Sequence, residues 1–436
     1  MNKEKFLEKS KEEVAQTCKT ISEFRVATIK WLEKAKKNYK NLSGIDKLVE
    51  DKLINYRDSR VEELAYLSGA PYFMHCKVKF EDDDEISDLF FGKFSFSEGS
   101  VYSWISAVSA IRFEEPGNTK YTKPGGEIKK VQLLQKDQYM IVDGKIKFLA
   151  TESIDLHREL IYQDHFSNRK SGFMLPEIVS QMEKAQDEVI RAHHIGPLVI
   201  SGPAGSGKTT LALHRIAYLL QSPDLENIFS GNSILVLVQD NGTKKYFSSL
   251  LPGLGIHNVA ITTFAEWAVI ILDLDVQYVA RIGEDEEGKD LYEYVKLEAL
   301  KRSTTNLSYT KNVFVVLKKF YDLYFTKEQQ KIFEKQKEEN ILDKIDLTVL
   351  LCVYKQKKEN LGIEAEYYVE KNDGSLKKKK GYRAYNYSIV LLDEFQNYLP
   401  RQIELIKSCI SKRTQGMLYV GDMAQQGQLG SINNFE

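Results

Sequence analysis

A glycine-rich segment near the middle of the chain has the residue types and the spacing that cradle the phosphates of a nucleotide. Its nine residues, GPAGSGKTT, are Gly202, Pro203, Ala204, Gly205, Ser206, Gly207, Lys208, Thr209 and Thr210. An apolar stretch precedes them and a helix-periodic stretch follows, which is the strand–loop–helix context that this motif requires. Glycines let successive N–H groups turn toward phosphate oxygens, and the helix N-terminus favours negative charge. The segment predicts an ATP site in which Lys208 contacts the β- and γ-phosphates and Thr209 binds Mg²⁺.

A second segment, SIVLLDEFQ, ends an apolar strand with two adjacent carboxylates, Asp393 and Glu394. A carboxylate at that position can hold Mg²⁺, and its neighbour can orient and deprotonate an attacking water. By itself an Asp-Glu pair after a strand is common, and a solvated strand end is the alternative. Because the pair follows the glycine loop within one α/β segment, we expect Asp393 to be the magnesium ligand and Glu394 the general base.

Two further polar positions are candidates for nucleotide contact. The segment MLYVGDMAQQ brings Gly421, Asp422 and Gln425 to the end of another apolar strand, where a polar side chain can sense the γ-phosphate. Gln186 precedes the first strand of the α/β segment, and its amide can donate to N7 of adenine while accepting from the exocyclic amine. The alternative for Gln186 is a surface residue of an amphipathic helix.

The elements that must position these residues have an α/β pattern from about residue 175. Short apolar strands, which suit a parallel sheet buried on both faces, are expected at 198–201, 234–238, 259–262, 389–392 and 417–420. Residues 265–383 separate the third strand from the fourth and are mostly helical in pattern. A stretch of that length between two strands of one sheet is best explained as an inserted subdomain.

The N-terminal part of the chain has two different patterns. Residues 2–39 and 45–67 carry apolar residues at helical spacing and are joined by a short turn, which predicts an antiparallel helical hairpin. Such a hairpin could be a helical subdomain packed on the body or a projecting coiled coil. Residues 72–149 are aromatic and alternating, and Asp143-Gly144 at the centre of 138–148 predicts a β-hairpin.

Composition limits the possible partners and compartments. The formal net charge of -1 gives no global attraction for nucleic acid, so any such contact would be a local patch. The basic run 377–380 could contact phosphates, but beside Asn372, Asp373 and Gly374 it is more simply a solvated loop tip. The four cysteines lack CxxC spacing and are expected to be reduced thiols of a cytoplasmic protein. No apolar run approaches the roughly 20 residues that span a bilayer, so no membrane contact is expected.

In their order along the chain, these motifs resemble those of superfamily 1 helicases of the UvrD/Rep type. Gln186 resembles the adenine-reading Q motif, GPAGSGKTT motif I, DEFQ motif II and GDMAQQ motif III. The resemblance implies hydrolysis of Mg-ATP with Lys208, Asp393, Glu394 and Gln396 in catalytic roles, Gln396 coupling nucleotide state to nucleic acid. It further implies that the strand end Thr262, Thr263 and Phe264 touches single-stranded DNA or RNA.

Flanking segments resemble the HelD, or helicase-IV-like, family of motor ATPases. These segments are PYFMHCKVKF, YTKPGGEIKK, QYMIVDGKIKF, ALHRIAYLL and LLPGLGIHNVAITTFAEW. The resemblance implies RNA polymerase as a partner, with the N-terminal hairpin entering its secondary channel and the insertion entering its main DNA channel. One departure lies at VYSWISAVSAIRF, which keeps only Trp104 of an Asp-Trp-Arg-like core.

The expected fold class is therefore α/β, with a P-loop, RecA-like parallel sheet. We expect four regions: a helical hairpin (1–68), a β-rich module (69–150), the RecA-like domain (175–264 and 384–436) and the mostly helical insertion (265–383). In the family a second RecA-like domain with an arginine finger follows motif III. We expect this chain to need that missing C-terminal half for efficient hydrolysis, since such an arginine contributes about 10³–10⁵-fold in rate.

Two alternatives to a HelD-like ATPase stay open. The chain could be part of a conventional UvrD/Rep-type DNA helicase, with the hairpin as a packed accessory domain. It could also be a nucleotide-dependent binding or regulatory module that has no motor activity.

Overall fold

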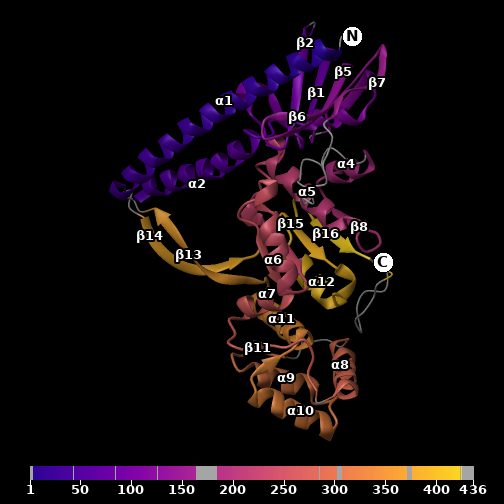
Figure 1. Cartoon of the computed structure of the whole chain (residues 1–436). Coiled ribbons are helices and arrows are strands. Elements are labelled where there is room, and N and C mark those ends of the chain that lie inside the picture. The colour runs from indigo at the N-terminus through magenta and orange to yellow at the C-terminus, as the bar shows by residue number, and fades with distance from the viewer. Residues whose placement is uncertain are drawn as a thin grey trace.

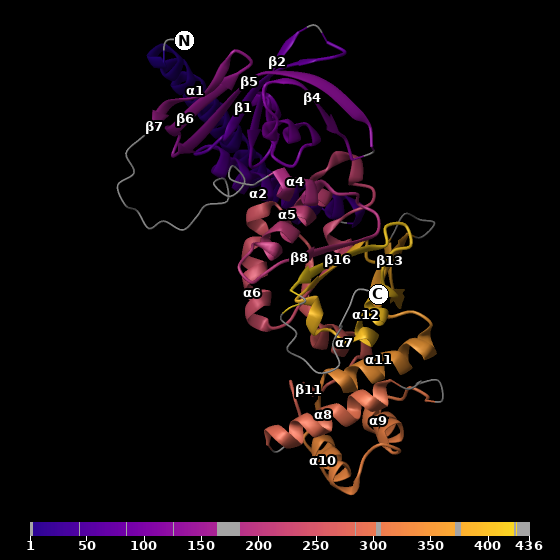
Figure 2. The same ribbon diagram turned by 90° about the vertical axis from the view of Figure 1, so that its right-hand side faces the viewer.

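The computed structural model describes residues 3–42, 44–83, 85–124, 126–163, 184–283, 285–301, 307–370, 376–422 and 424. The chain is elongated, with a β-rich module at one end, a parallel sheet in the middle and a helical insertion at the other end (Figures 1 and 2). Within the described ranges, none of the helices combines the length and the apolar content that a bilayer span needs.

The first two helices, α1 (Lys3–Asn38) and α2 (Gly44–Leu67), form an arm that projects to one side (Figure 1). At its base, Val14 and Leu64 are buried against the β-rich module. Further out, the two helices cover each other only through a small cluster around Leu32 and Ile54. Tyr56 is 69% exposed, so the predicted apolar stripe is covered only in part. Both expected arrangements are thus present, a packed base and a projecting end.

The β-rich module is a mostly antiparallel sheet in the order β3-β2-β1-β5-β6-β7, with β4 paired to β5. Its strands are β1 (Met74–Phe80), β2 (Ile86–Gly92), β3 (Val101–Ser103), β4 (Gly117–Thr122), β5 (Ile128–Val142), β6 (Lys145–Ser153) and β7 (Leu156–Gln163). Asp143 and Gly144 both have left-handed φ, 49° and 69°, as a two-residue type I′ hairpin requires. The predicted hairpin is therefore present as β5 and β6. The sheet runs past the expected end at residue 150, because β7 pairs with β6.

The central sheet has five parallel strands in the order β10-β9-β15-β16-β8. They are β8 (Pro197–Ser201), β9 (Ile234–Val238), β10 (Ala260–Thr263), β15 (Ile389–Asp393) and β16 (Gly416–Gly421). The three inner strands are buried throughout, as continuous apolar runs predict. The outer strands β8 and β10 are not, since an edge strand lacks a neighbour on one side. The expectation of full burial is wrong for these two.

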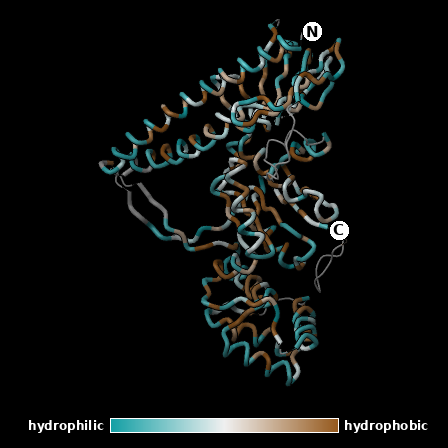
Figure 3. The backbone as a smooth tube through the Cα atoms, viewed as in Figure 1, coloured by the Kyte–Doolittle hydropathy of each residue, from teal (hydrophilic) through white to brown (hydrophobic). Residues whose placement is uncertain are grey.

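Alternate residues of the inner strands contribute to two apolar cores. In Figure 3 many segments of the central region are brown, the colour of hydrophobic residues. One core contains α5 (Lys208–Gln221) and α6 (Asn241–Leu250) and continues into the β-rich module. Trp104 of that module lies edge-on to His214 of α5, with ring centroids 5.0 Å apart. The β-rich module and the sheet therefore share one core. The opposite face packs against α7 (Phe264–Leu272), α11 (Lys344–Lys358) and α12 (Pro400–Lys407).

The insertion is mostly helical, as expected, but contains a long β-hairpin. Its other helices are α8 (Glu286–Leu300), α9 (Val313–Tyr321) and α10 (Lys327–Glu338), with a short pair of strands β11 (Gln277–Tyr278) and β12 (Ile341–Leu342). The hairpin is β13 (Gly362–Glu370) with β14 (Leu376–Ala384), paired antiparallel over nine positions. Lys377–Lys380 thus belong to a strand, and their prediction as a loop tip is wrong. Backbone pairing with β13, 362–370, outweighs the turn signal of the residues just before the lysines.

A fully buried ion cluster holds the helices of the insertion together. The Lys296 ammonium lies 2.9 Å from Asp343 and 2.7 Å from Asp346, and its exposed fraction is 0%. Asp346 also accepts hydrogen bonds from the Tyr321 hydroxyl at 2.8 Å and the Gln336 amide at 2.7 Å. The cluster joins α8, α9, α10 and α11, so the buried polar groups of these helices find their partners on one another.

Replacing Lys296 with methionine should destabilise the chain by about 3–5 kcal/mol, because two carboxylates would remain buried without their cation. The free energy of unfolding is measured by urea titration of the full chain. Lys318→Met is the matched control, since Lys318 is 60% exposed and pairs with Glu334 at 3.0 Å. That exposed pair is expected to contribute less than about 1 kcal/mol. Equal losses for the two variants would contradict the assigned role of the cluster.

Candidate ATP and magnesium site

The glycine-rich loop joins the end of β8 to the start of α5, as its motif predicts. Gly205 and Gly207 have φ of 76° and 79°, a left-handed conformation that glycine adopts without steric cost. Residues 203–207 are exposed, and Lys208 to Thr210 are half-buried. The Lys208 ammonium donates to the carbonyl of Pro203 at 2.8 Å. The loop therefore curves around its lysine and presents its backbone to the outside.

Thr209 and Asp393 meet although 184 residues separate them, with the Thr209 hydroxyl 3.3 Å from a carboxylate oxygen of Asp393. Strand β16 lies between β8 and β15, and the carboxyl ends of all three reach one edge of the sheet. A hydroxyl and a carboxylate oxygen side by side are the hard ligands that Mg²⁺ prefers, so this pair fits the ion. Burial, and then the charge of Glu394, raises the pKa of Asp393 to about 6.

Glu394 and Gln396 form the second part of the edge. Glu394 has a left-handed φ of 49°, a conformation that is strained for a residue with a side chain. The Gln396 amide donates to the Glu394 carboxylate at 2.6 Å, and its oxygen accepts from the backbone N–H of Asp422 at 3.2 Å. Gln396 is 1% exposed. Its side chain therefore links the residue after β15 to the residue after β16.

Gly421 makes room for this link. A Cβ at that position would lie 2.1 Å from the Gln396 side-chain oxygen and 2.9 Å from the Phe395 ring. Only glycine fits there without displacing Gln396, so the residue type at the end of β16 is fixed by the amide opposite.

Gln239 is a residue at this edge that the sequence interpretation missed. It follows β9, and its amide lies 3.3 Å and 3.5 Å from the carbonyls of Asp393 and Glu394, to which it donates. These contacts stabilise the strained turn at Glu394 from the end of β9. A polar residue directly after an apolar parallel strand was the available signal, because such strands all end at the same edge.

Gln186 lies on α4 (Lys184–Arg191) and is exposed. Its helix is fastened to α5, the helix that begins at the glycine loop, because the buried Arg215 guanidinium donates to the carbonyls of Ile190, Ala192 and His193 at 2.7–2.9 Å. Ile190 lies in the last turn of α4, where carbonyls lack partners within the helix, and Ala192 and His193 directly follow that helix. The contact of Gln186 with adenine stays a prediction.

The same helix is also tied to the β-rich module. Asp187 pairs with Arg191 at 2.6 Å and with Arg112 at 3.2 Å, and both arginines donate to the carbonyl of Trp104 at 3.0–3.1 Å. Trp104 and Arg112 belong to the segment that departs from the HelD pattern. That segment fastens the β-rich module to α4. No local pattern predicts this cluster, because Arg112 and Asp187 are 75 residues apart.

The remaining candidates are placed as follows. Asp422 is half-buried and accepts from the N–H of Ala424 at 2.9 Å, while Gln425 lies outside the described residues. Thr263 caps α7, accepting from the N–H of Glu266 at 3.2 Å.

Thr262 donates to the Glu266 carboxylate at 2.9 Å. Phe264 is 7% exposed and packs in the core with Trp267. Its ring is therefore not presented to a nucleic-acid base, whereas contact through the half-buried Thr262 and Thr263 stays a prediction.

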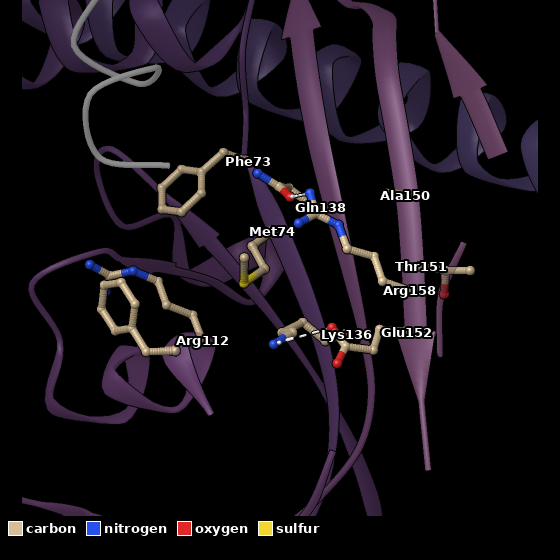
Figure 4. A pocket seen from close by; sticks show the side chains of 10 residues that line it. Phe73, Met74, Arg112, Lys136, Gln138, Ala150, Thr151, Glu152 and Arg158 are labelled. Atoms are coloured by element: carbon tan, nitrogen blue, oxygen red, sulfur yellow. Dashed lines mark hydrogen bonds and ion pairs between the residues drawn. The ribbon is translucent and has the colours of Figure 1, made fainter. Parts of the chain in front are cut away.

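A cavity of about 290 Å³ lies in the β-rich module, away from this edge (Figure 4). Its cations already have partners: Lys136 lies 3.5 Å from Glu152, and Arg158 donates to Gln138 at 2.7 Å. Arg112 is paired with Asp187, as described above. The candidate ATP site is therefore the sheet edge where the motifs come together, and not this cavity.

A parallel sheet whose carboxyl edge gathers a glycine loop, a carboxylate pair and a bridging glutamine defines a P-loop nucleotide-binding domain. The family model of the UvrD/REP helicase N-terminal domain matches residues 182–426, more than half of the 436 residues. The chain belongs to this family. The match includes the loop 202–210, Asp393 and Gln396.

Similarity to individual proteins is more limited. The chain is 36% identical over 109 residues to the ATP-dependent DNA helicase PcrA of Staphylococcus epidermidis, in each of two strains. The aligned part is 24% of this chain and 14% of the length of that relative. The chain thus spans a small part of the curated relatives that it matches.

Replacing Gly421 with alanine should destabilise the chain by about 1–3 kcal/mol, because the new methyl group overlaps the Gln396 amide. Gly253→Ala is the control, since Gly253 is exposed and a Cβ there meets nothing within 4 Å. The comparison is made by urea unfolding of the two variants and the parent chain. A Gly421→Ala variant as stable as the control would show that the edge is less tightly packed than its geometry indicates.

Proposed function

We propose that this chain binds Mg-ATP at Gly202–Thr210 and supplies one half of the catalytic site of a superfamily 1 motor ATPase that acts on nucleic acid. The observation that carries the proposal is the 3.3 Å contact between the Thr209 hydroxyl and Asp393. It joins the phosphate-binding motif to the carboxylate motif at a single point. Membership of the UvrD/REP family supports the choice of nucleic acid as the substrate.

The side chains at the edge have separable roles in this proposal. Lys208 balances the charge of the β- and γ-phosphates, and Thr209 with Asp393 holds the magnesium ion. When bound, the ion neutralises charge that develops on the transferring phosphoryl group. Glu394 is placed to accept a proton from the attacking water. Gln396, bonded to Glu394 and to the backbone of Asp422, relays the state of the site to the loop after β16.

The other half of the site is proposed to come from a second RecA-like domain. The part of the chain that the structure describes has one five-stranded parallel sheet. Motor ATPases of this superfamily close two such sheets around ATP, and an arginine from the second stabilises the transition state. Binding of ATP is thus proposed for this chain alone, and efficient turnover for the chain together with that domain.

We propose further that the motor is HelD-like, works in the cytoplasm and remodels complexes of RNA polymerase with nucleic acid. The projecting end of the α1–α2 arm favours this over a conventional DNA helicase, in which the hairpin would be a packed accessory domain (Figure 1). Its outer surface carries apolar side chains, with Tyr56 69% and Leu53 42% exposed. Exposed apolar residues on a projecting element favour contact with another protein.

Lys208→Ala should weaken ATP binding at least tenfold, because a charge-assisted contact contributes about 1.5–3 kcal/mol. Binding is measured with a fluorescent ATP analogue in the presence of Mg²⁺. Lys245→Ala is the control, since Lys245 is exposed on α6, outside the loop. If the Lys208 variant binds ATP as tightly as the parent chain, the loop is not the ATP site. If the chain alone shows robust nucleic-acid-stimulated hydrolysis of ATP, the proposal that it supplies only half of the catalytic site is refuted.

The arm is tested separately. A Leu53→Lys/Tyr56→Lys variant should lose at least nine tenths of its capture of core RNA polymerase, because two apolar contacts would be replaced by charge. Its ATP affinity should stay at the parent value. A Lys245→Ala variant, altered at an exposed position of α6 outside both the arm and the insertion, serves as the control. If the arm variant captures core RNA polymerase as well as the parent chain does, the conventional helicase is favoured. If Lys208→Ala loses ATP binding but still captures the polymerase, the ATP site and the polymerase contact are shown to be separate.

A further inference from the structure

The hairpin β13–β14 separates its charges between two faces. Directly opposed residues of an antiparallel pair lie on the same face, and alternate residues of a strand share a face. One face therefore holds the pairs Ile363↔Arg383 and Ala365↔Gly381, together with Lys379; we name these five residues the basic face.

The other face holds the pairs Glu364↔Tyr382 and Glu366↔Lys380, which we name the acidic face. Among the described residues, the basic face has two cations and no carboxylate. The acidic face has two carboxylates and one lysine, and Lys380 pairs with Glu366 at 3.8 Å. The charges are separated because of the strand register. The glutamates of β13 occupy even-numbered positions, the unpaired cations of β14 occupy odd-numbered positions, and the two sets lie on opposite faces.

One residue of the acidic face, Tyr382, packs on the body of the chain, while Glu364 and Glu366 of that face are exposed. Tyr382 contacts the apolar core below the sheet, and its hydroxyl donates to the carbonyl of Asn360 at 2.6 Å. Lys358 lies over the Tyr382 ring, 4.9 Å from its centroid. On the basic face Lys379 and Arg383 are both exposed, and the residues between and beside them are half-buried. Neither cation has a carboxylate within ion-pair distance among the residues described.

The basic face has the shape of a short track. Lys379 and Arg383 are four residues apart on one strand, which corresponds to about 13 Å at about 3.3 Å per residue. The pair Ala365↔Gly381 lies between them and carries almost no side chain. A nucleic-acid backbone carries one negative charge at each nucleotide, so a short stretch of it can meet both cations of the track. A backbone can lie along it with a cation at each end.

The hairpin also leads directly into the magnesium strand. Residues 385–388 connect β14 to β15, which ends at Asp393. In this connection Tyr385 and Tyr387 stack with centroids 5.1 Å apart, and Tyr387 is 7% exposed. The hairpin projects to the same side of the sheet as the α1–α2 arm (Figure 1). A ligand on the basic face would thus be fastened to the strand that carries the catalytic carboxylates.

We propose that the basic face binds the sugar–phosphate backbone of a nucleic-acid strand, at a site separate from the Thr262–Thr263 strand end. This rests on the proposed function in taking nucleic acid as the substrate. Charge complementarity, the absence of carboxylates and the flat Ala365–Gly381 floor favour this occupant. The competing explanation is that the lysines only keep the open strand edges from pairing with other chains. An acidic protein surface is the other occupant that the test distinguishes.

The test uses the full chain and a fluorescently labelled single-stranded oligonucleotide, with affinity measured by anisotropy over a series of salt concentrations. Each phosphate contact contributes about 0.7 to the slope of log affinity against log salt for a single strand. Lys379→Gln/Arg383→Gln should therefore reduce the slope by about 1.4 and weaken binding at low salt at least tenfold. The charge-matched control is Lys380→Gln/Lys311→Gln, in which Lys380 is on the acidic face and Lys311 is 95% exposed on another part of the insertion. This control should keep the parent slope.

The outcomes separate this proposal from the proposed function. If Lys379→Gln/Arg383→Gln keeps the salt slope and the affinity of the parent chain, the hairpin site is overturned. This holds whether the variant stays monomeric or self-associates; self-association is the result that edge protection predicts. Loss of an acidic protein partner with unchanged oligonucleotide binding would overturn it equally. If the slope falls as expected while the parent chain fails to bind ATP, the hairpin site stands and the proposed function fails. Unchanged ATP affinity in the hairpin variant is the expected companion result.

Discussion

Parallel pairing brings the carboxyl ends of β8, β9, β15 and β16 to one edge of the central sheet, and the polar residues of the site follow directly from this arrangement. Each strand is largely apolar, and the residues of the site stand at its end or directly after it. The glycine loop follows β8, Asp393 ends β15, and Gln239 follows β9 and supports the turn. A shift of one strand by one residue would exchange the sets that face the two cores, so the edge is held in register by the burial of both faces.

The two cores also decide what can move. One includes the β-rich module and α5, and the other includes α7, α11 and α12. Close-packed interiors transmit displacements but do not deform continuously. Changes at the nucleotide edge must therefore pass through the loops that leave it. Gln396 is bonded to both such loops, one beginning at Glu394 and the other at Asp422. The absence of a Cβ at Gly421 is what allows that amide to lie between them.

Much of the site was predictable because its signals are local. The glycine loop, the carboxylate pair and the strand Ile234–Val238 each lie within a few residues and need no partner to be recognised. The errors have a common physical origin. Residues 377–380 look like a loop until 362–370 are known to pair with them. Arg112 and Asp187 form a buried pair only once the β-rich module packs on α4. Long-range pairing decided these cases, and no local pattern encodes it.

The insertion is anchored to the sheet by more than one connection. Helix α11 contributes Asp346 to the buried Lys296 cluster at one position and Thr348 to the sheet side at another, where the Gln402 amide of α12 donates to it at 3.2 Å. Helix α12 itself begins a few residues after Gln396. Chain connectivity therefore leads from Gln396 at the sheet edge to α12, and a hydrogen bond leads from α12 to α11, whose Asp346 lies in the buried cluster of the insertion. The insertion leaves the sheet at the carboxyl end of β10, and the hairpin β13–β14 returns the chain to the amino end of β15, so this part of the chain is attached to opposite edges of the sheet.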